Sequence, residues 1–321
     1  MNSSLKKPRT SHGSTVASAN YLEIFPLELL NEFRSHIPQT DLRTAVCFYC
    51  TCPQFAAAFK VGLGRQEPKF WRMSCLMSGL GRLPNEESYK IDWKGIAITS
   101  IMKDGFCDHP QCGASRLEQN VLDMRKHVLQ NDDSYMVHQE EQDPGDLYTN
   151  PLLSFIGFSK HRATGYGNED AQLLYDDNPR QGLVWGRSNT LWDHPIACRS
   201  YAIYPLIGNF IPRMGYGMSL MFNGPNNFHG ITVWDVQEVL RKILDVELSK
   251  YDMIQLLEEF PVQVSEGCDA ATVISKLSTM RGFLRYCKLD GIRHDSDAEF
   301  EIYPRMIYEF SEKKRIGSKC R

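Results

Sequence analysis

Apolar positions near the start of the chain recur with the spacing of an amphipathic helix. Pro26 suits a first helical turn, where its missing N–H group is not needed, and Pro38 cannot continue a helix, so a helix is predicted over about residues 26–36. One face of this helix carries Leu29, Leu30, Phe33 and Ile37. Because water disfavours such a face, the sequence predicts that another surface, inside or outside the chain, covers it.

Two more short helices are predicted directly after the first. Asp41 can cap the second helix, and Pro53 marks its end. Its inward positions are Leu42, Ala45, Val46 and Tyr49. The third helix is predicted in the segment "PQFAAAFKV". A three-helix unit within residues 21–60 is too small to be strongly stable alone, so it is expected to dock on a partner or on the next element.

Helical patterns continue to about residue 129. The segments that carry them are "FWRMSCLMSGLG", "DWKGIAITSIM" and "CGASRLEQNVLDMRKHVL", which make residues 61–129 a predicted helical region. Residues 130–150 are acidic and polar and contain a Pro-Gly pair, which is typical of a linker or an exposed loop.

Residues 151–310 combine strand and helix signals. Short apolar runs between Gly, Pro and Asn residues predict strands in "LLSFIGF", "GLVWG", "SYAIYPL" and "GMSLMF". Thr232 with Asp235, and Ser249 with Asp252, predict the starts of two later helices. The predicted fold class is therefore α+β, with a small sheet and helices on one side of it. Residues 1–20 are expected to be a disordered tail and residues 311–321 a basic tail.

Composition narrows the classes of partner. The 321-residue chain is 42% hydrophobic and 23% charged, with a formal net charge of -3, so no overall basic field attracts nucleic acid or an anionic membrane. The sequence has no apolar run long enough for a membrane span and no apolar secretory segment, so a cytoplasmic or nuclear location is expected. Its 10 cysteines are then expected to be reduced.

Residues 24–55 resemble an F-box. The family pattern opens with an apolar residue and proline, followed by a variable residue, glutamate and two apolar residues, and this chain has Phe25, Pro26, Leu27, Glu28, Leu29 and Leu30. Phe33, the Ile37-Pro38 pair and the Asp41-Leu42 pair fill later positions of the pattern. Arg34 departs from it, because an apolar residue usually stands there, and "CTCPQF" keeps only Cys52 and Phe55 of the usual ending.

Other segments extend the resemblance to fungal F-box proteins. These segments are "FWRMSCLMSGLG", "DWKGIAI" and "HPQCG". In the second half, "GITVWDVQEVL" and "MRGFLRYCKLDGI" look like a fungal domain of unknown function, a resemblance that implies no activity.

The F-box resemblance implies binding to the Skp-type adaptor of a cullin-RING ubiquitin ligase. Residues 151–310 would then present an unknown protein substrate, and the chain itself would not be an enzyme. The expected adaptor-binding residues are Phe25, Pro26, Leu27, Glu28, Leu29, Leu30, Phe33, Ile37 and Leu42. Three alternatives stay open: an apolar face covered by the chain's own second half, an F-box-like interaction protein outside a ligase, and a small zinc-binding protein or enzyme with a helical cap.

Two cysteine-containing segments are candidates for metal chemistry. "CFYCTC" places Cys47, Cys50 and Cys52 together without a second ligand pair at a usual distance, so plain thiols are expected there. In the segment that begins "CDHPQC", zinc would accept Cys107, Cys112 and His127, with His109 or His138 as a fourth ligand. Because this spacing matches no regular zinc finger, the prediction is that no metal or other cofactor is bound.

Motifs with a known catalytic mechanism are absent from the sequence. It contains no phosphate-binding loop of the Gly-x-x-x-x-Gly-Lys-Ser/Thr type, no His-Glu-x-x-His and no Gly-x-Ser-x-Gly. Asp193, His194 and Cys198 are close together in "DHPIACRS", but a nucleophile and its base usually meet through the fold and not through adjacency in the chain. The sequence therefore predicts no catalytic residue.

Overall fold

A computed structural model describes most of the first half of the chain and parts of the second. The described residues are 25–84, 86, 90–107, 112–127, 147–157, 172–173, 194–208, 211–214, 229–243, 246–259, 278–280, 287–296 and 299–306. The two predicted tails and the predicted strands in "GLVWG" and "GMSLMF" lie outside these residues.

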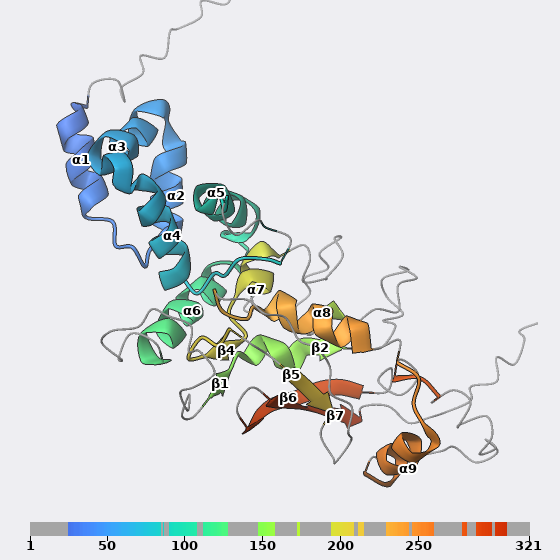
Figure 1. Cartoon of the computed structure of the whole chain (residues 1–321). Helices are drawn as coiled ribbons and strands as arrows, with labels where there is room; N and C mark the ends of the chain where they lie inside the picture. Colours follow the sequence, from blue (N-terminus) through green and yellow to red (C-terminus); the bar gives the residue numbers. More distant parts are fainter. Residues whose placement is uncertain are drawn as a thin grey trace, which may run out of the picture.

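Apart from an isolated bridge of Leu80 with Ser200, helices account for the secondary structure described up to residue 127, as the sequence predicts. They are α1 (Leu27–Ser35), α2 (Leu42–Thr51), α3 (Pro53–Leu63), the short 3-10 helix η2 (Gly64–Gln66), α4 (Glu67–Met77), α5 (Trp93–Asp104) and α6 (Gly113–His127). Figure 1 shows α1 to α4 gathered at one end of the molecule, with α5 and α6 beside them.

Helix starts follow the predicted caps. The Asp41 carboxylate accepts a hydrogen bond from the backbone N–H of Thr44 at 3.0 Å, so it caps α2. In the second half, Thr232 Oγ1 accepts from the backbone N–H of Asp235 at 3.2 Å, and Asp235 Oδ2 accepts from the backbone N–H of Thr232 at 2.8 Å. This reciprocal pair starts α8 (Val233–Ile243) as predicted.

The first three helices dock on the next helices of the chain. The Phe59 ring of α3 stacks on Trp71 of α4 with ring centroids 5.2 Å apart, and Tyr49 of α2 meets the same indole edge-on at 5.4 Å. Leu42 and Val46 of α2 belong to this buried cluster, which continues into α5. The expectation that the small unit needs a docking surface is therefore met within the chain for α2 and α3.

Within the described part of the chain, no single helix is both long enough and apolar enough to cross a membrane. Leu42–Thr51 and Pro53–Met77 meet the length and composition requirements only when taken together, and the two parts are bent by 119°.

The second half adds short strands and further helices, so the fold is α+β. Its elements in order are β1 (Tyr148–Thr149), the 3-10 helix η3 (Pro151–Phe155), β2 (Ile156–Gly157), β3 (Gln172–Leu173), α7 (Pro195–Arg199), β4 (Ile203–Tyr204), β5 (Ile211–Met214), α8, α9 (Lys250–Glu259), β6 (Cys287–Ser296) and β7 (Glu299–Met306). β1 pairs with β4, and a second sheet has the strand order β3-β2-β6-β7-β5. All pairings are antiparallel except the parallel pair β5 and β7.

Two local predictions are corrected by the structure. Most of "LLSFIGF" is not a strand, because the Asn150 side chain accepts from the backbone N–H of Leu152 at 3.0 Å and its carbonyl accepts from Leu153, which starts the 3-10 turn η3. The end of the predicted linker 130–150 is also ordered, since β1 pairs with β4.

The helical region contacts the second half of the chain through backbone and side-chain hydrogen bonds. The backbone N–H of Gly81 donates to the Arg199 carbonyl at 2.7 Å, and that of Tyr201 donates to the Gly79 carbonyl at 3.2 Å. The Asn120 amide of α6 donates to Ser200 Oγ at 2.9 Å. Residues 199–201 therefore pack against the helical region.

Candidate functional site

Helix α1 has one apolar side that the described part of the chain leaves exposed. Phe25, Leu29 and Phe33 are 46%, 49% and 54% exposed, whereas Leu30 is 2% exposed. The three exposed residues are four positions apart, so they follow one side of the helix and the turn before it. Leu29 and Phe33 on the nine-residue helix and Phe25 just before it form a compact exposed apolar surface, here called the α1 outer face.

The structure divides the nine predicted adaptor-binding residues by burial. Phe25, Pro26, Glu28, Leu29 and Phe33 are exposed, Leu27 and Ile37 are half-buried, and Leu30 and Leu42 are buried. Leu42, at 1% exposure, belongs to the cluster around Trp71. Leu30 and Leu42 therefore stabilise this chain's own fold, which corrects their expected place on the contact surface.

Arg34, the departure from the F-box pattern, does not interrupt the α1 outer face. Its side chain is half-buried and approaches α3 at Gly62, where an added Cβ atom would lie 3.2 Å from Arg34 Nε. The same Cβ atom would collide with the Asn31 side chain. Asn31 and Arg34 thus mark the side of α1 that packs on α3, and Gly62 allows the two helices to approach closely.

The three cysteines of "CFYCTC" lie on α2 and at its end. Cys50 is exposed, Cys47 and Cys52 are half-buried, and all three are free thiols. Desolvation, and then the neighbouring Cys47, raise the pKa of Cys50, which disfavours the reactive thiolate that redox chemistry needs. This placement is consistent with plain thiols.

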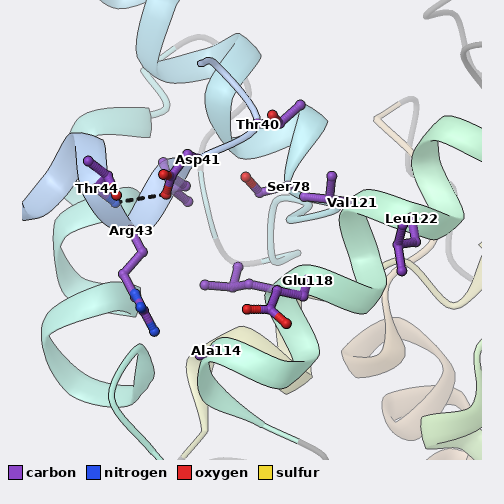
Figure 2. A pocket seen from close by; sticks show the side chains of 11 residues that line it. Thr40, Asp41, Arg43, Thr44, Ser78, Ala114, Glu118, Val121 and Leu122 are labelled. Atoms are coloured by element: carbon purple, nitrogen blue, oxygen red, sulfur yellow. Dashed lines mark hydrogen bonds between the residues drawn. The ribbon is translucent and has the colours of Figure 1, made fainter. Parts of the chain in front are cut away.

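A hollow of about 490 Å³ lies between the start of α2 and α6 (Figure 2). Its lining residues are Thr40, Asp41, Leu42, Arg43, Thr44, Ser78, Ala114, Leu117, Glu118, Val121 and Leu122. The lining includes neither cysteine nor histidine, and the Asp41 carboxylate is already bonded to the Thr44 backbone, as the dashed line shows. The hollow lies at the junction of the first helices with α6.

The residues of "DHPIACRS" do not form a catalytic pair. Asp193 lies outside the described residues. Cys198 is buried, its thiol donates to the Pro195 carbonyl at 3.4 Å, and desolvation raises its pKa to about 12. His194 instead places Nδ1 2.9 Å from Asp104 Oδ1. A buried, protonated thiol hydrogen-bonded to a carbonyl is a structural cysteine and a poor nucleophile.

The two cysteines of "CDHPQC" meet, as the sequence-based zinc hypothesis requires, but the predicted histidine is elsewhere. Cys112 Sγ lies 2.7 Å from Cys107 Sγ. Burial, followed by the hydrogen bond with Cys107, raises the pKa of Cys112. The His127 ring instead stacks on Tyr148 with centroids 4.7 Å apart, and His109 and His138 lie outside the described residues.

Two residues that the sequence-based zinc hypothesis did not include complete the group around these thiols. The potential ligand atoms of Asp104, Cys107, Cys112 and His194 all lie within 4.8 Å of one another. Asp104 is only three positions before Cys107, but an aspartate at the end of a helix is too common to be a signal by itself. His194 is 90 positions from Asp104, and only the docking of α7 beside α5 brings them together.

Comparisons of the chain with family models, with curated proteins and with solved structures find no match.

Proposed function

We propose that this protein is the substrate-receptor subunit of a Skp-cullin-F-box ubiquitin ligase. The observation that carries the proposal is the α1 outer face, a row of exposed apolar side chains on a helix whose other side is packed on α3. The resemblance of residues 24–55 to an F-box supports a Skp-type adaptor as the occupant of that face. An amphipathic helix that buries an apolar row in a partner's groove is a common mode of recognition.

The adaptor contact in this proposal comes from the exposed residues. Leu29 and Phe33 are the central anchors, Phe25 and Pro26 extend the contact, and Glu28 lies at its rim. Leu30 contributes indirectly, because its burial holds α1 in place. Truncation of one central anchor is expected to cost about 2 kcal/mol of binding free energy, which is roughly 30-fold in Kd.

The remaining parts of the proposal follow from this role. The second half binds an unknown protein substrate, and the chain contributes proximity and orientation while other subunits transfer ubiquitin. The proposal includes no catalytic residue in this chain, and it places the protein in the cytoplasm, the nucleus or both.

A pull-down with the purified adaptor tests the proposal. The full chain is expected to bind at micromolar concentration, and the Leu29→Asp, Phe33→Asp double variant is expected to lose binding because two charges would be buried at the contact. Met102→Asp is the control, since Met102 is an exposed apolar residue at 60% that lies on α5 and not on α1. Circular dichroism should show that all three proteins are folded.

The possible outcomes separate the alternatives. No adaptor binding by the unaltered chain would overturn the proposal, and equal loss in the Met102 variant would overturn the assignment to α1. Adaptor binding without co-purification of a cullin would indicate an F-box-like interaction protein outside a ligase.

A further inference from the structure

The end of α5, the start of α6 and the start of α7 meet at four side chains with metal-binding chemistry. Asp104 is the last residue of α5, Cys107 follows it, Cys112 precedes α6, and His194 precedes α7. We propose that these four residues bind one zinc ion. The proposal is independent of the adaptor surface on α1.

The combination of ligands favours zinc over other cations. Two thiol groups, one imidazole and one carboxylate form a mixed sulfur, nitrogen and oxygen set, which suits borderline-soft Zn²⁺. Calcium and magnesium require mostly oxygen ligands, so the cysteine pair disfavours them. Four protein ligands fill a tetrahedral shell and leave no open position, which is the arrangement of a structural site.

The distances require only small movements. Zn–S bonds of about 2.3 Å and Zn–N or Zn–O bonds of about 2.0–2.1 Å place tetrahedral ligand atoms roughly 3.3–3.8 Å apart. The two sulfur atoms are 2.7 Å apart, His194 Nδ1 and Asp104 Oδ1 are 2.9 Å apart, and no pair of potential ligand atoms exceeds 4.8 Å. Movements of about 1 Å or less at each ligand would open the pairs and admit the ion.

Asp104 is already oriented for this role. Its side chain is 1% exposed, and its Oδ2 atom accepts from the backbone N–H of Ile196 at 3.3 Å. The other oxygen, Oδ1, is the one directed at His194. A buried carboxylate fixed through one oxygen can hold a ligand geometry without a large ordering cost.

Local backbone contacts also fix the positions of Cys107 and Cys112. The Cys107 N–H donates to the Asp104 carbonyl at 2.9 Å, and the Cys112 carbonyl accepts from the N–H of Arg116 at 3.3 Å. Gly113 has φ +60°, and a Cβ atom there would collide with the Cys107 carbonyl. These contacts hold Cys107 and Cys112 on one side of the site through short local connections.

His194 would let a bound zinc ion link two distant segments of the chain. It comes from the second half of the chain, so a bound ion would join the α5–α6 junction to α7 across 90 positions. Zinc would then stabilise the interface between the helical region and the second half, because metal binding to the folded chain adds to its folding free energy.

Metal analysis of the full-length protein tests this assignment. Protein purified without chelator is expected to contain about one equivalent of zinc, and Cys112→Ser and His194→Ala are expected to contain less than about 0.1 equivalent. His127→Ala and Cys198→Ala are matched controls, because they remove a histidine and a buried cysteine outside the group, and they should keep the metal. Loss of zinc in the control variants alone would overturn the ligand assignment.

A second measurement does not depend on the folding of variants. Unaltered protein, stripped of metal and then loaded with Co²⁺, is expected to show the visible absorption of a tetrahedral cobalt site together with thiolate-to-cobalt charge transfer, and zinc should displace both signals. A disulfide between Cys107 and Cys112 in protein purified under reducing conditions would overturn the proposal. So would the absence of both zinc and the cobalt spectrum in folded, reduced protein.

Discussion

Leu29 and Leu30 are neighbours in the chain, and only one of them faces solvent: Leu29 is 49% exposed and Leu30 is 2% exposed. Successive residues of an α-helix point about 100° apart, so one helix can hold its own fold with Leu30 and present Leu29 to a partner. This division separates effects on stability from effects on binding.

The first prediction concerns this division. Leu30→Ala should lower the free energy of unfolding by about 2–4 kcal/mol, because it leaves a cavity beneath α1, whereas Leu29→Ala should change it by less than about 0.5 kcal/mol. Urea denaturation followed by circular dichroism measures both values. Equal destabilisation by the two variants would contradict the orientation of α1.

The second prediction concerns a buried ion pair on α6. Arg116 Nη2 lies 3.2 Å from Asp123 Oδ2, and the two side chains are only 6% and 5% exposed. Asp123→Ala should cost about 3 kcal/mol or more in unfolding free energy, because the guanidinium group would stay buried without its counter-charge. Denaturant titration is the measurement.

A double variant provides the control for that pair. Arg116→Met with Asp123→Leu removes both charges and should be less destabilising than Asp123→Ala alone, since no unpaired charge remains. If the double variant is the less stable of the two, the pair itself, and not the penalty of an unpaired charge, dominates the energetics.

The third prediction concerns the pH dependence of stability. Cys75 is fully buried, and desolvation raises its pKa from 9.0 to about 12. Above pH 9.0 the unfolded thiol loses its proton while the folded one keeps it, so the stability due to this group is fully present below pH 9.0 and is lost as the pH approaches about 12. The loss should be about 1.4 kcal/mol per pH unit in this window.

Denaturation series at several alkaline pH values measure this loss. Cys75→Ala should be less stable at neutral pH but should show a shallower decline above pH 9.0 than the unaltered protein. Cys50→Ser, which changes an exposed thiol, should decline almost as steeply as the unaltered protein. Identical slopes for the Cys75 variant and the unaltered protein would contradict the assignment of that pKa shift.

The fourth prediction compares two glycines with positive φ. Gly113 has φ +60° and lies against the backbone of Cys107 and Asp104, whereas Gly64 has φ +51° and has no atom within 4 Å of its would-be Cβ. Gly64→Ala should cost about 1–2 kcal/mol in unfolding free energy through backbone strain alone, and Gly113→Ala should cost more because a collision is added. Thermal or urea denaturation decides the order, and a larger effect at Gly64 would contradict the close fit at Gly113.

Local chemistry was sufficient to predict the helical first half. Three helix starts depend on residues within three or four positions of the backbone groups they affect. These are the proline at the start of α1, the aspartate before α2 and the Thr232-Asp235 pair before α8. Such local effects can be predicted from the sequence alone. The same reasoning did not predict the hairpin of β6 and β7, because the polar residues of "CKLDGIRHDS" give no clear alternation and the register shifts twice along the pair.

The two candidate sites also depend partly on local sequence and partly on tertiary contacts. The sequence by itself determined that α1 carries an apolar face that another surface must cover, and that Cys107 and Cys112 are close enough in the chain to meet. Only the tertiary structure decided that Leu30 and Leu42 turn inward, and that Asp104 and His194 join the cysteines where His127 does not. The physical reason is range: helical periodicity acts over a few residues, whereas the docking of α7 beside α5 depends on contacts between segments 90 positions apart.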